Sequence, residues 1–516
     1  MSAEPARIEE PFAAAREEYR EIEAYLGSKE TRSMRHSDLE RELEKRGREL
    51  MRQLLQAHLE VRGPGEAEGP VEGSDGVVRE QERVHERGLE TVFGEVKVER
   101  LGYGAEGTDS LHPLDAELNL PKELYSHEVR RRVAAAVAEG SFDKAVAGLE
   151  ETTGAKVGKR QMEELAARAA QDFDAFYEAR GSAWSSEREK MGAVLVISVD
   201  GKGVVMRRSD LREATRKRAE ASRHKLQTRL SRGEKRNSKR MATVATVYTI
   251  APYVRRPEDV VRTLAPHNER EDTSRPRPEH KRVWASVEKT PEEVIKEAIR
   301  EARSRDPDGR KQWVALVDGN LSQLKILRQL LRRYGVRAPI VVDFIHVSEY
   351  VWKAGTALHG ESNPELDTWV SERLLQILHN RCGHVAAGMR RSATLREFSS
   401  KARKAVDRCA DYLLKNSRFI QYEGFLTLGV PIATGVVEGA CRYLIKDRMD
   451  VTGARWSLAG AEAVLKLRAL RASGDFDAYW RFHEEQEYHR NHVVHYALGK
   501  VVPVHREKRP RLKLIK

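Results

Sequence analysis

The sequence predicts a mixed α/β fold of the α+β kind, and the prediction depends on the order of its apolar runs. Five runs rich in Val, Ile and Ala have the length and composition of buried strands, and they lie at residues 193–199, 241–250, 282–287, 313–317 and 338–342. Two stretches with helical apolar spacing separate the last three strands, at residues 291–302 and 321–334. The order is therefore three strands, helix, strand, helix, strand. It is the order of an RNase H-like domain, in which three antiparallel strands lead into parallel strands flanked by helices.

Length and composition indicate a large basic protein. The 516 residues are too many for one simple core and predict about three or four modules. Lys and Arg total 92 against 80 Asp and Glu, and the net charge of +12 favours a polyanionic partner, nucleic acid before membrane. The three cysteines lie far apart without a Cys-x-x-Cys spacing, so we expect reduced thiols and neither disulfides nor a zinc site. The chain has no basic-then-apolar leader and no apolar run near ~20 residues, so we expect a soluble cytoplasmic protein.

The N-terminal part is expected to begin with helices and a linker. Residues 1–62 have charged helical patterns with narrow apolar stripes, which predict packing on another helix, in this chain or in a second copy. Residues 63–91 open with a stretch rich in Gly, Glu and Pro, which is typical of a linker or an exposed loop.

Residues 92–185 are expected to form a small DNA-binding domain. An alternating strand at residues 93–101 precedes short helical stretches punctuated by glycines. This pattern is typical of a helix-turn-helix unit, although any small helical bundle has a similar one. If the unit binds DNA, Lys159 and Arg160 would contact it.

The most basic part of the chain directly follows the first predicted core strand. Residues 207–240 hold fourteen Lys or Arg against four Asp or Glu, which is +10 of the total +12. A charge run is usually a solvated helix face, but so few acids argue for contacts with phosphates, which position a nucleic acid without reading its sequence. The residues expected to make them are Arg207, Arg208, Arg216, Lys217, Arg218, Arg236 and Arg240.

Three carboxylates lie where the predicted core would bring them together. Asp200 closes the first strand and Asp318 closes the fourth, and these strand ends are neighbours in the predicted topology. Two carboxylates held close repel each other unless a cation lies between them, and the hard cations Mg²⁺ or Mn²⁺ suit oxygen ligands. We expect the third carboxylate, Glu438, from the first turns of a later helix with Thr434 as its N-cap.

The predicted elements also set the remaining domain boundaries. The RNase H-like core is expected in two parts, residues 186–350 and 432–483, because helical apolar spacing fills residues 351–431 between them. This middle segment is therefore predicted to be an all-helical insertion. Residues 484–516 are expected to form a basic C-terminal tail.

Five short stretches carry a resemblance to a known family. They are residues 198–203 (SVDGKG), 316–320 (LVDGN), 343–347 (DFIHV), 433–439 (ATGVVEG) and 446–456 (KDRMDVTGARW). Together they resemble bacterial insertion-sequence transposases of the DDE class, in particular the ISKra-type family, which is itself similar to Mutator-like transposases. The resemblance extends from about residue 94 to residue 483.

This resemblance implies roles for particular residues. Asp200, Asp318 and Glu438 would be the catalytic triad and the metal ligands. Asp343 and His346 would match the family's Asp-x-x-His element and support the triad. In the last stretch, the residues added to the expected DNA contacts are Lys446, Arg448, Arg455 and Trp456.

The implied activity is DNA transposition in the bacterial nucleoid. The protein would cut at the end of its insertion sequence and join the freed 3′-hydroxyl to target DNA, with two Mg²⁺ (or Mn²⁺) ions bound by the three carboxylates. Its partners would be the terminal inverted repeats, the target DNA and further copies of the chain, as a homodimer or higher homo-oligomer on DNA.

Other functions are compatible with part of the sequence. An RNase H-like nuclease without strand transfer would need the same carboxylates. A non-catalytic DNA-binding protein would explain the charge but not three carboxylates at these elements. A phosphate-loop nucleotide enzyme is excluded, because residues 201–203 (GKG) lack the Gly-x-x-x-x-Gly-Lys-Ser/Thr pattern.

Overall fold

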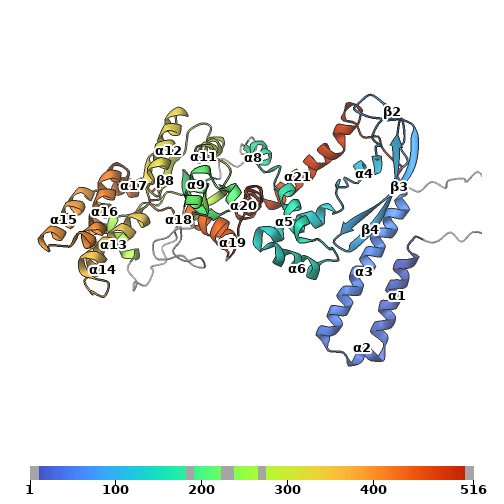
Figure 1. Ribbon diagram of the computed structural model, residues 1–516, viewed down its shortest axis with the longest axis horizontal. Coiled ribbons are helices and arrows are strands. Elements are labelled where there is room, and N and C mark those ends of the chain that lie inside the picture. Colours follow the sequence, from blue (N-terminus) through green and yellow to red (C-terminus); the bar gives the residue numbers. More distant parts are fainter. Residues whose placement is uncertain (1–10, 182–190, 222–236, 265–274, 452, 506–516) are drawn as a thin grey trace, which may run out of the picture. The chain divides into compact units, whose positions relative to one another are not determined.

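The chain is organised as two units. The structure, a computed structural model, describes residues 11–181, 191–221, 237–264, 275–451 and 453–505 (Figure 1). Unit 1 comprises Met1–Phe176 and Asp475–Lys516, and unit 2 comprises Tyr177–Gly474. The fold is mixed α/β, as predicted. Within the described ranges, no helix combines the length and the apolar character needed to cross a membrane.

Unit 1 begins with a helical hairpin. α1 (Ala13–Gly27) and α3 (His36–Arg62) pack against each other and are joined by the short α2 (Lys29–Ser33), as Figure 1 shows. Ala15 and Ile22 are the buried residues of α1. The prediction that these helices pack on another helix is confirmed, and the partner helix lies in the same chain.

Four strands follow where the sequence predicted a linker and one strand. β1 (Val71–Glu72) pairs with β2 (Val78–Arg79), and β3 (Gln81–Thr91) pairs along its whole length with β4 (Gly94–Gly104). The prediction of a linker at residues 63–91 is therefore wrong. The first half of β3 is polar and exposed, so its sequence has no apolar alternation, and the hydrogen bonds to β4 supply the order that its composition does not indicate.

The C-terminal segment belongs to the core of unit 1. α21 (Phe476–Asn491) opens it, and beyond this helix Tyr496 and Val504 are buried in the two apolar clusters beside β4. The expected tail at residues 484–516 is wrong as far as residue 505, because Tyr496 and Val504, with Val501 and Val502 packed beside them, anchor this segment in the core. Residues 506–516 lie outside the described part of the chain.

Short helices complete unit 1. They are α4 (Pro113–Glu117), α5 (His127–Glu139), α6 (Phe142–Thr152) and α7 (Lys159–Ala169). Ser126 and Ser141 cap α5 and α6 by accepting backbone N–H groups of their first turns. α5, α6 and α7 pack on one another, so the predicted series of short helices is confirmed. α8 (Phe173–Gly181) contains the boundary between the units.

Unit 2 is built on the five predicted strands, which form one mixed sheet. They are β5 (Val194–Val205), β6 (Lys239–Ile250), β7 (Glu279–Ser286), β8 (Gln312–Val317) and β9 (Ile340–Val342). Their order across the sheet is β7-β6-β5-β8-β9. β5, β6 and β7 are antiparallel, whereas β8 pairs in parallel with β5 and β9 in parallel with β8. The predicted adjacency of the first and fourth strands is confirmed.

β5 continues beyond its predicted end at Asp200. Its antiparallel pairing with β6 extends to Val205, opposite Lys239, whereas its parallel pairing with β8 ends at Val199, opposite Val317. Asp200 therefore lies inside β5, at the level where the neighbouring strand β8 ends.

Helices flank the strands as the sequence predicted. α11 (Pro291–Arg305) begins with a capping box formed by Thr290 and Glu293, and α12 (Leu321–Arg333) begins after the N-cap Asn320. Three further helices belong to this unit: α9 (Glu213–Ala221), α10 (Pro257–Leu264) and α20 (Leu458–Ser473). Of these, α20 packs on β7.

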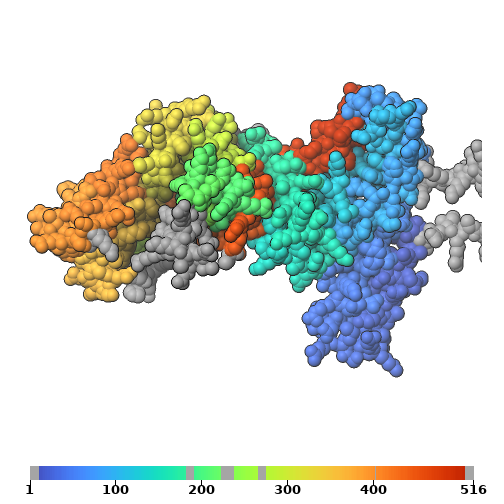
Figure 2. Space-filling view, in the orientation of Figure 1, coloured from blue at the N-terminus to red at the C-terminus, as the bar shows by residue number. Residues whose placement is uncertain are grey.

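An all-helical insertion follows β9, as predicted. Its helices are α13 (Phe344–His359), α14 (Leu366–Leu378), α15 (Cys382–Leu395), α16 (Ser400–Asn416) and α17 (Tyr422–Thr427), and Figure 2 shows most of them in yellow to orange. α13 starts directly after β9, so the helical segment begins before the expected boundary at residue 351. The chain then returns to the sheet through α18 (Gly435–Ala440), the π-helical turn η5 (Cys441–Lys446) and α19 (Asp447–Met449).

Candidate active site

Two aspartates lie side by side where β8 ends. Asp200 and Asp318 each follow one member of the last residue pair that joins β5 to β8. The Oδ1 atom of Asp200 accepts a hydrogen bond from the Gly201 N–H at 2.6 Å, and that of Asp318 accepts one from the Asn320 N–H at 2.8 Å. Burial raises the pKa of Asp318, the Asn320 N–H opposes this shift, and the Asp200 carboxylate raises the pKa further. The Asp200 carboxylate is thus close enough to act on Asp318.

The loop after β8 is held by the helical insertion. Tyr412 of α16 donates a hydrogen bond of 2.8 Å from its hydroxyl to the carbonyl oxygen of Asp318. Gly319 has φ 88°, and a Cβ there would lie 2.5 Å from the Tyr412 hydroxyl, so both conformation and space require glycine. The Tyr412 ring stacks on Tyr350 with 4.2 Å between centroids, and His346 meets both rings edge-on. His346 therefore supports the tyrosine that holds this loop.

Asp343 is fully buried and joins two helix starts. It is the N-cap of α13, because its Oδ1 accepts the Ile345 N–H at 3.0 Å. The same oxygen accepts the Thr434 N–H at 3.1 Å, and the Thr434 hydroxyl donates to Oδ2 at 2.7 Å. Thr434 occupies the predicted N-cap position of α18, but its side chain does not cap that helix, because its hydroxyl bonds to Asp343 instead. Asp343 thus ties the start of α18 to the start of α13.

Glu438 lies one helical turn after Thr434. The Thr434 hydroxyl is also within 3.4 Å of Glu438 Oε1. The Glu438 side chain still reaches solvent. Its pKa is nevertheless raised to about 7, mainly by partial burial and next by the negative charge of Asp343, with a smaller effect from Asp200. α18 packs on β5 and β6. The structure therefore brings all three carboxylates of the predicted triad into one region, with Asp343 beside them.

Cys441 is a member of this site that the sequence analysis missed. Its thiol donates to Asp200 Oδ2, with 3.1 Å between sulfur and oxygen, so each carboxylate oxygen of Asp200 has a donor. Burial and the nearby Asp200 raise the pKa of the Cys441 thiol, which keeps it protonated and able to donate. Its position three residues after Glu438 was an available signal, because such residues share a helix face.

The residues present fit a divalent cation. Asp200, Asp318 and Glu438 supply the hard oxygen donors that Mg²⁺ and Mn²⁺ prefer, and a cation would relieve the repulsion that raises two of their pKa values. Among the described residues, no three His, Cys, Asp or Glu side chains already surround a common point at ligand distance. The three carboxylates therefore lie in one region, but they are not arranged around a common point as the ligands of a metal ion are.

The sequence matches no protein-family model and no curated protein. The roles expected for Asp200, Asp318 and Glu438 therefore stay predictions. What the structure adds is the proximity of these residues and the hydrogen bonds that hold their neighbours.

Most of the predicted DNA-binding residues are accessible. Lys159 and Arg160 are exposed on the first turn of α7, where they pair with Asp143 at 2.8 Å and Glu164 at 3.1 Å. In unit 2 the exposed members are Arg207, Arg208, Lys217, Arg218, Lys446 and Arg455. Arg216 is half-buried, and Arg236 lies outside the described residues.

Three predicted DNA contacts instead have structural roles. Arg448 and Trp456 are buried, with the guanidinium 4.8 Å from the ring centroid and the Trp456 ring N–H donating to the Met449 carbonyl. The guanidinium of Arg240 donates to the backbone carbonyls of Val287 at 2.7 Å and Asp210 at 3.1 Å. Arg448 is 4% and Trp456 7% exposed, too little surface for a DNA contact, which corrects that prediction. The sequence did not indicate these structural roles, because the identity of a basic or aromatic residue does not tell whether its side chain contacts a phosphate or the protein itself.

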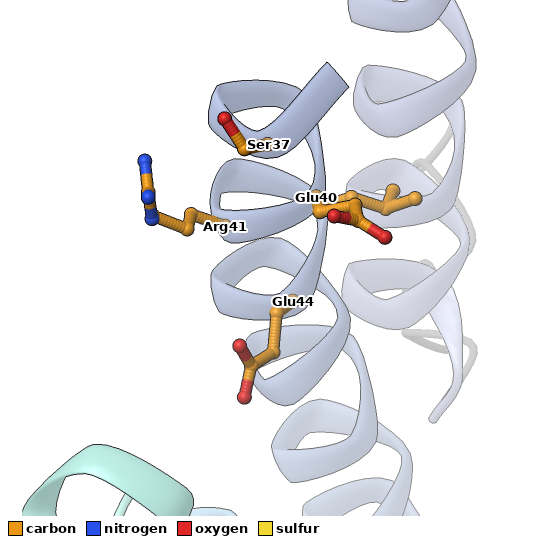
Figure 3. A pocket seen from close by; sticks show the side chains of 5 residues that line it. Ser37, Glu40, Arg41 and Glu44 are labelled. Carbon is orange, nitrogen blue, oxygen red and sulfur yellow. The ribbon is translucent and has the colours of Figure 1, made fainter. Parts of the chain in front are cut away.

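A shallow pocket lies elsewhere, on α3 of unit 1. Figure 3 shows Ser37, Glu40, Arg41 and Glu44, which line it together with Leu43. Their side chains fan out from one helix and do not converge on a common point, so this pocket has no catalytic arrangement.

Proposed function

We propose that this protein is a DDE-type transposase, which cleaves DNA at the ends of an insertion sequence and transfers the strand to target DNA. The observation that carries the proposal is the delivery of Asp200, Asp318 and Glu438 to one edge of the sheet by β5, β8 and α18. The strand order β7-β6-β5-β8-β9, with three antiparallel strands followed by two parallel ones, supports an RNase H-like core. The resemblance of the five sequence stretches to DDE transposases supports the same function.

The three carboxylates would hold the two Mg²⁺ or Mn²⁺ ions that this chemistry needs. When bound, such ions supply an activated oxygen nucleophile and stabilise the leaving oxygen of a phosphodiester. The chain's own residues would position the ligands. Cys441 and the Gly201 N–H orient Asp200, and Tyr412 holds the backbone of Asp318.

Glu438 is positioned through a chain of hydrogen bonds. The buried Asp343 fixes Thr434 by its backbone N–H and its hydroxyl, and that hydroxyl also reaches Glu438. Because both oxygens of Asp343 already accept hydrogen bonds and the residue has no exposed surface, its proposed role is to position the helix that carries Glu438.

Exposed cations close in sequence to the site would bind the DNA backbone. Arg207 and Arg208 follow the end of β5, and Lys217 and Arg218 lie on α9 just beyond them. Exposed Arg and Lys side chains of this kind bind phosphates without reading base sequence.

The direct test uses labelled DNA duplexes that carry the sequences flanking the gene. Incubation with Mg²⁺ or Mn²⁺ should yield cut ends with a 3′-hydroxyl and, with target DNA present, joined products of greater length on a denaturing gel. Cutting without joining would indicate the nuclease alternative. No cutting of either flank with either metal would contradict the proposal.

A further inference from the structure

The solvent-facing side of α12 is strongly basic. Residues 319–342, which contain α12 and end with β9, hold five Lys or Arg and no Asp or Glu. Four of the five lie on the helix itself, and we call them the α12 cations: Lys325, Arg328, Arg332 and Arg333. Three of them are exposed, and Arg328 is half-buried. α12 therefore presents positive charge to solvent without a negative residue of its own.

The α12 cations lie on one side of the helix because of their spacing. They follow one another at intervals of three, four and one residues, and the buried Leu324, Leu327 and Leu331 occupy the opposite side. Ser322 and Gln329, which lie on the same side as the cations, are also accessible. Hydroxyl and amide groups, like Lys and Arg, are common contacts of DNA phosphates. The outward side of α12 thus combines cationic and neutral groups that bind phosphates.

Exposed cations on other helices of this chain have acidic partners. Arg160 of α7 pairs with Glu164 at 3.1 Å, and Lys217 of α9 pairs with Glu213 at 2.6 Å, each across one helical turn. By contrast, no described acid forms an ion pair with an α12 cation. Two of the α12 cations are four residues apart, and like charges at that spacing destabilise a helix. Among the described residues nothing offsets this cost, so the surface is suited to an anion from outside the chain.

The α12 cations begin close to the candidate active site. α12 starts three residues after Asp318, and a Cβ at Gly201 would lie 3.6 Å from Nε2 of Gln323 in its first turn. The first turn of α12 thus lies against β5 beside Asp200. Lys325 follows within about one turn, and the row of α12 cations then continues for about 12 Å, at a rise of 1.5 Å per residue.

This position and length favour DNA as the anion. A free phosphate or a nucleotide carries its charge at one point, whereas a row about 12 Å long matches an anion that repeats along a line. The phosphodiester backbone is such an anion. DNA bound at the carboxylates continues beyond the bond that is cut, and so supplies phosphates to a surface that begins beside them.

We propose that the α12 cations bind the phosphate backbone of duplex DNA where it extends beyond the carboxylates, without reading its sequence. This inference rests on the proposed function, because that function brings DNA to Asp200 and Asp318. It adds a second basic surface to the cations near the end of β5, and the sequence analysis did not identify it.

The test is DNA binding by the full chain in metal-free buffer, measured by fluorescence anisotropy with a labelled duplex of random sequence over a range of salt concentrations. The variant Lys325→Gln, Arg332→Gln, Arg333→Gln removes the three exposed α12 cations, and glutamine keeps the helix stable. Its affinity should fall about tenfold or more. The slope of log affinity against log salt concentration should fall by about 2–3, because each phosphate contact contributes about 0.9.

Two controls separate this surface from the net charge of the chain. Arg20→Gln, Arg32→Gln, Arg41→Gln removes the same charge from exposed positions of α1, α2 and α3, and it should change neither the affinity nor the salt slope. Exchanging Lys for Arg and Arg for Lys at the three mutated α12 positions keeps the charge and should retain both. Circular dichroism and thermal unfolding should show every variant folded.

Cleavage is measured on the same samples, so that this inference and the proposed function can fail separately. A glutamine variant that binds DNA as well as the wild type, with the same salt slope, would overturn the inference and leave the proposed function standing where the wild type cleaves. A wild type that cleaves neither flank, with a glutamine variant that still loses affinity, would contradict the proposed function alone.

Two further results would overturn the inference. One is an equal loss of affinity in the control on α1, α2 and α3, which would show an effect of net charge only. The other is binding to vesicles of anionic lipid that depends on the α12 cations, together with DNA binding that does not, which would assign the surface to a membrane.

Discussion

Two carboxylates with shifted pKa values, Glu487 of unit 1 and Glu438 of unit 2, have opposite surroundings. In unit 1, Glu487 is 4% exposed and accepts hydrogen bonds from Arg130 at 2.8 Å and Arg490 at 2.6 Å. In unit 2, Glu438 has the buried Asp343 as its neighbour. Burial alone would raise both pKa values, but the arginines lower the pKa of Glu487 to about 2, whereas Asp343 helps to raise that of Glu438 to about 7.

The difference separates a charge network that stabilises the fold from a cluster of carboxylates whose proposed role is to bind a cation. The Glu487 network also contains His483 and Asp172, which meet at 2.7 Å, and it joins α5 to α21. Every carboxylate in it has a cationic or hydrogen-bonding partner inside the protein. The unit 2 cluster gathers like charges instead, and their repulsion is relieved by protonation of a carboxylate or by a bound cation.

The largest expected effect is on catalysis in unit 2. Asp200→Asn, Asp318→Asn and Glu438→Gln should each reduce cleavage below detection, because an amide cannot replace the carboxylate charge in metal binding. DNA binding should remain. In metal-free buffer the thermal stability should not fall, since each change removes repulsion between like charges. Gel assays of cleavage and thermal unfolding of the same samples check both parts.

The matched control for these substitutions is Asp308→Asn, on the loop before β8 and outside the acidic cluster, which should leave cleavage unchanged. Retained turnover in any triad variant would remove that residue from the site. A large loss of stability in metal-free buffer would contradict the comparison between the units.

The same acid-to-amide change should act oppositely in unit 1. Glu487→Gln leaves Arg130, which is 1% exposed, without its closer charge partner, since Glu123 lies 3.7 Å away, and breaking a buried pair in this way costs about 3–5 kcal/mol of unfolding free energy. Urea unfolding measures it. Glu485→Gln, an exposed position on the same helix, is the control and should change stability by less than about 0.5 kcal/mol. Equal effects at the two positions would show that the buried pair contributes nothing.

A smaller effect is expected at Thr434, which positions Glu438. Thr434→Val keeps the shape but removes the hydroxyl that bonds to Asp343, so we expect about a 10–100-fold loss in cleavage rate and in metal affinity. Thr434→Ser keeps the hydroxyl and should restore most of both. Metal affinity can be measured by calorimetry without turnover. If the serine variant is as impaired as the valine variant, the hydroxyl is not the positioning group.

The sequence predicted the sheet of unit 2 well for a physical reason. Its strands are buried on both faces, so they are continuous apolar runs, and the order of elements leaves few topologies. The adjacency of Asp200 and Asp318 followed from that order. β3 was not predicted because its outer half is polar. The segment around Val504 was not predicted because it packs through short 3-10 turns and single bridges to residues far away in sequence, which no helix or strand period indicates.

The partners within the site were harder to predict. Cys441, Tyr412 and Thr434 reach the carboxylates through contacts between residues far apart in sequence, and no local pattern specifies them. Arg448 and Trp456 were predicted to contact DNA, but the fold buries both side chains. A charge count identifies how many cations a segment has, but only the fold decides which of them face solvent.

The smallest expected effect is the pH dependence of the Glu487 network. Burial would raise the pKa of Glu487, but Arg130 and Arg490 outweigh it and lower the pKa to about 2 from the ordinary value of 4.5. A carboxylate with a lowered pKa contributes stability that is complete above its unfolded pKa and is lost as pH falls through the folded value. The difference in unfolding free energy between the wild type and Glu487→Gln should therefore shrink as pH falls from above 4.5 towards 2.

Glu462 of unit 2 provides the opposite case for that experiment. It is buried, and burial raises its pKa even though the backbone N–H groups of Val287 and Glu288 oppose the shift. Its protonation therefore favours the folded state, so Glu462→Gln should be neutral or stabilising at pH 7 and should lose any advantage as pH falls through the raised pKa. Urea unfolding at a series of pH values measures both differences. A difference for Glu487→Gln that stays constant down to pH 2 would mean that its arginines do not stabilise the charged form.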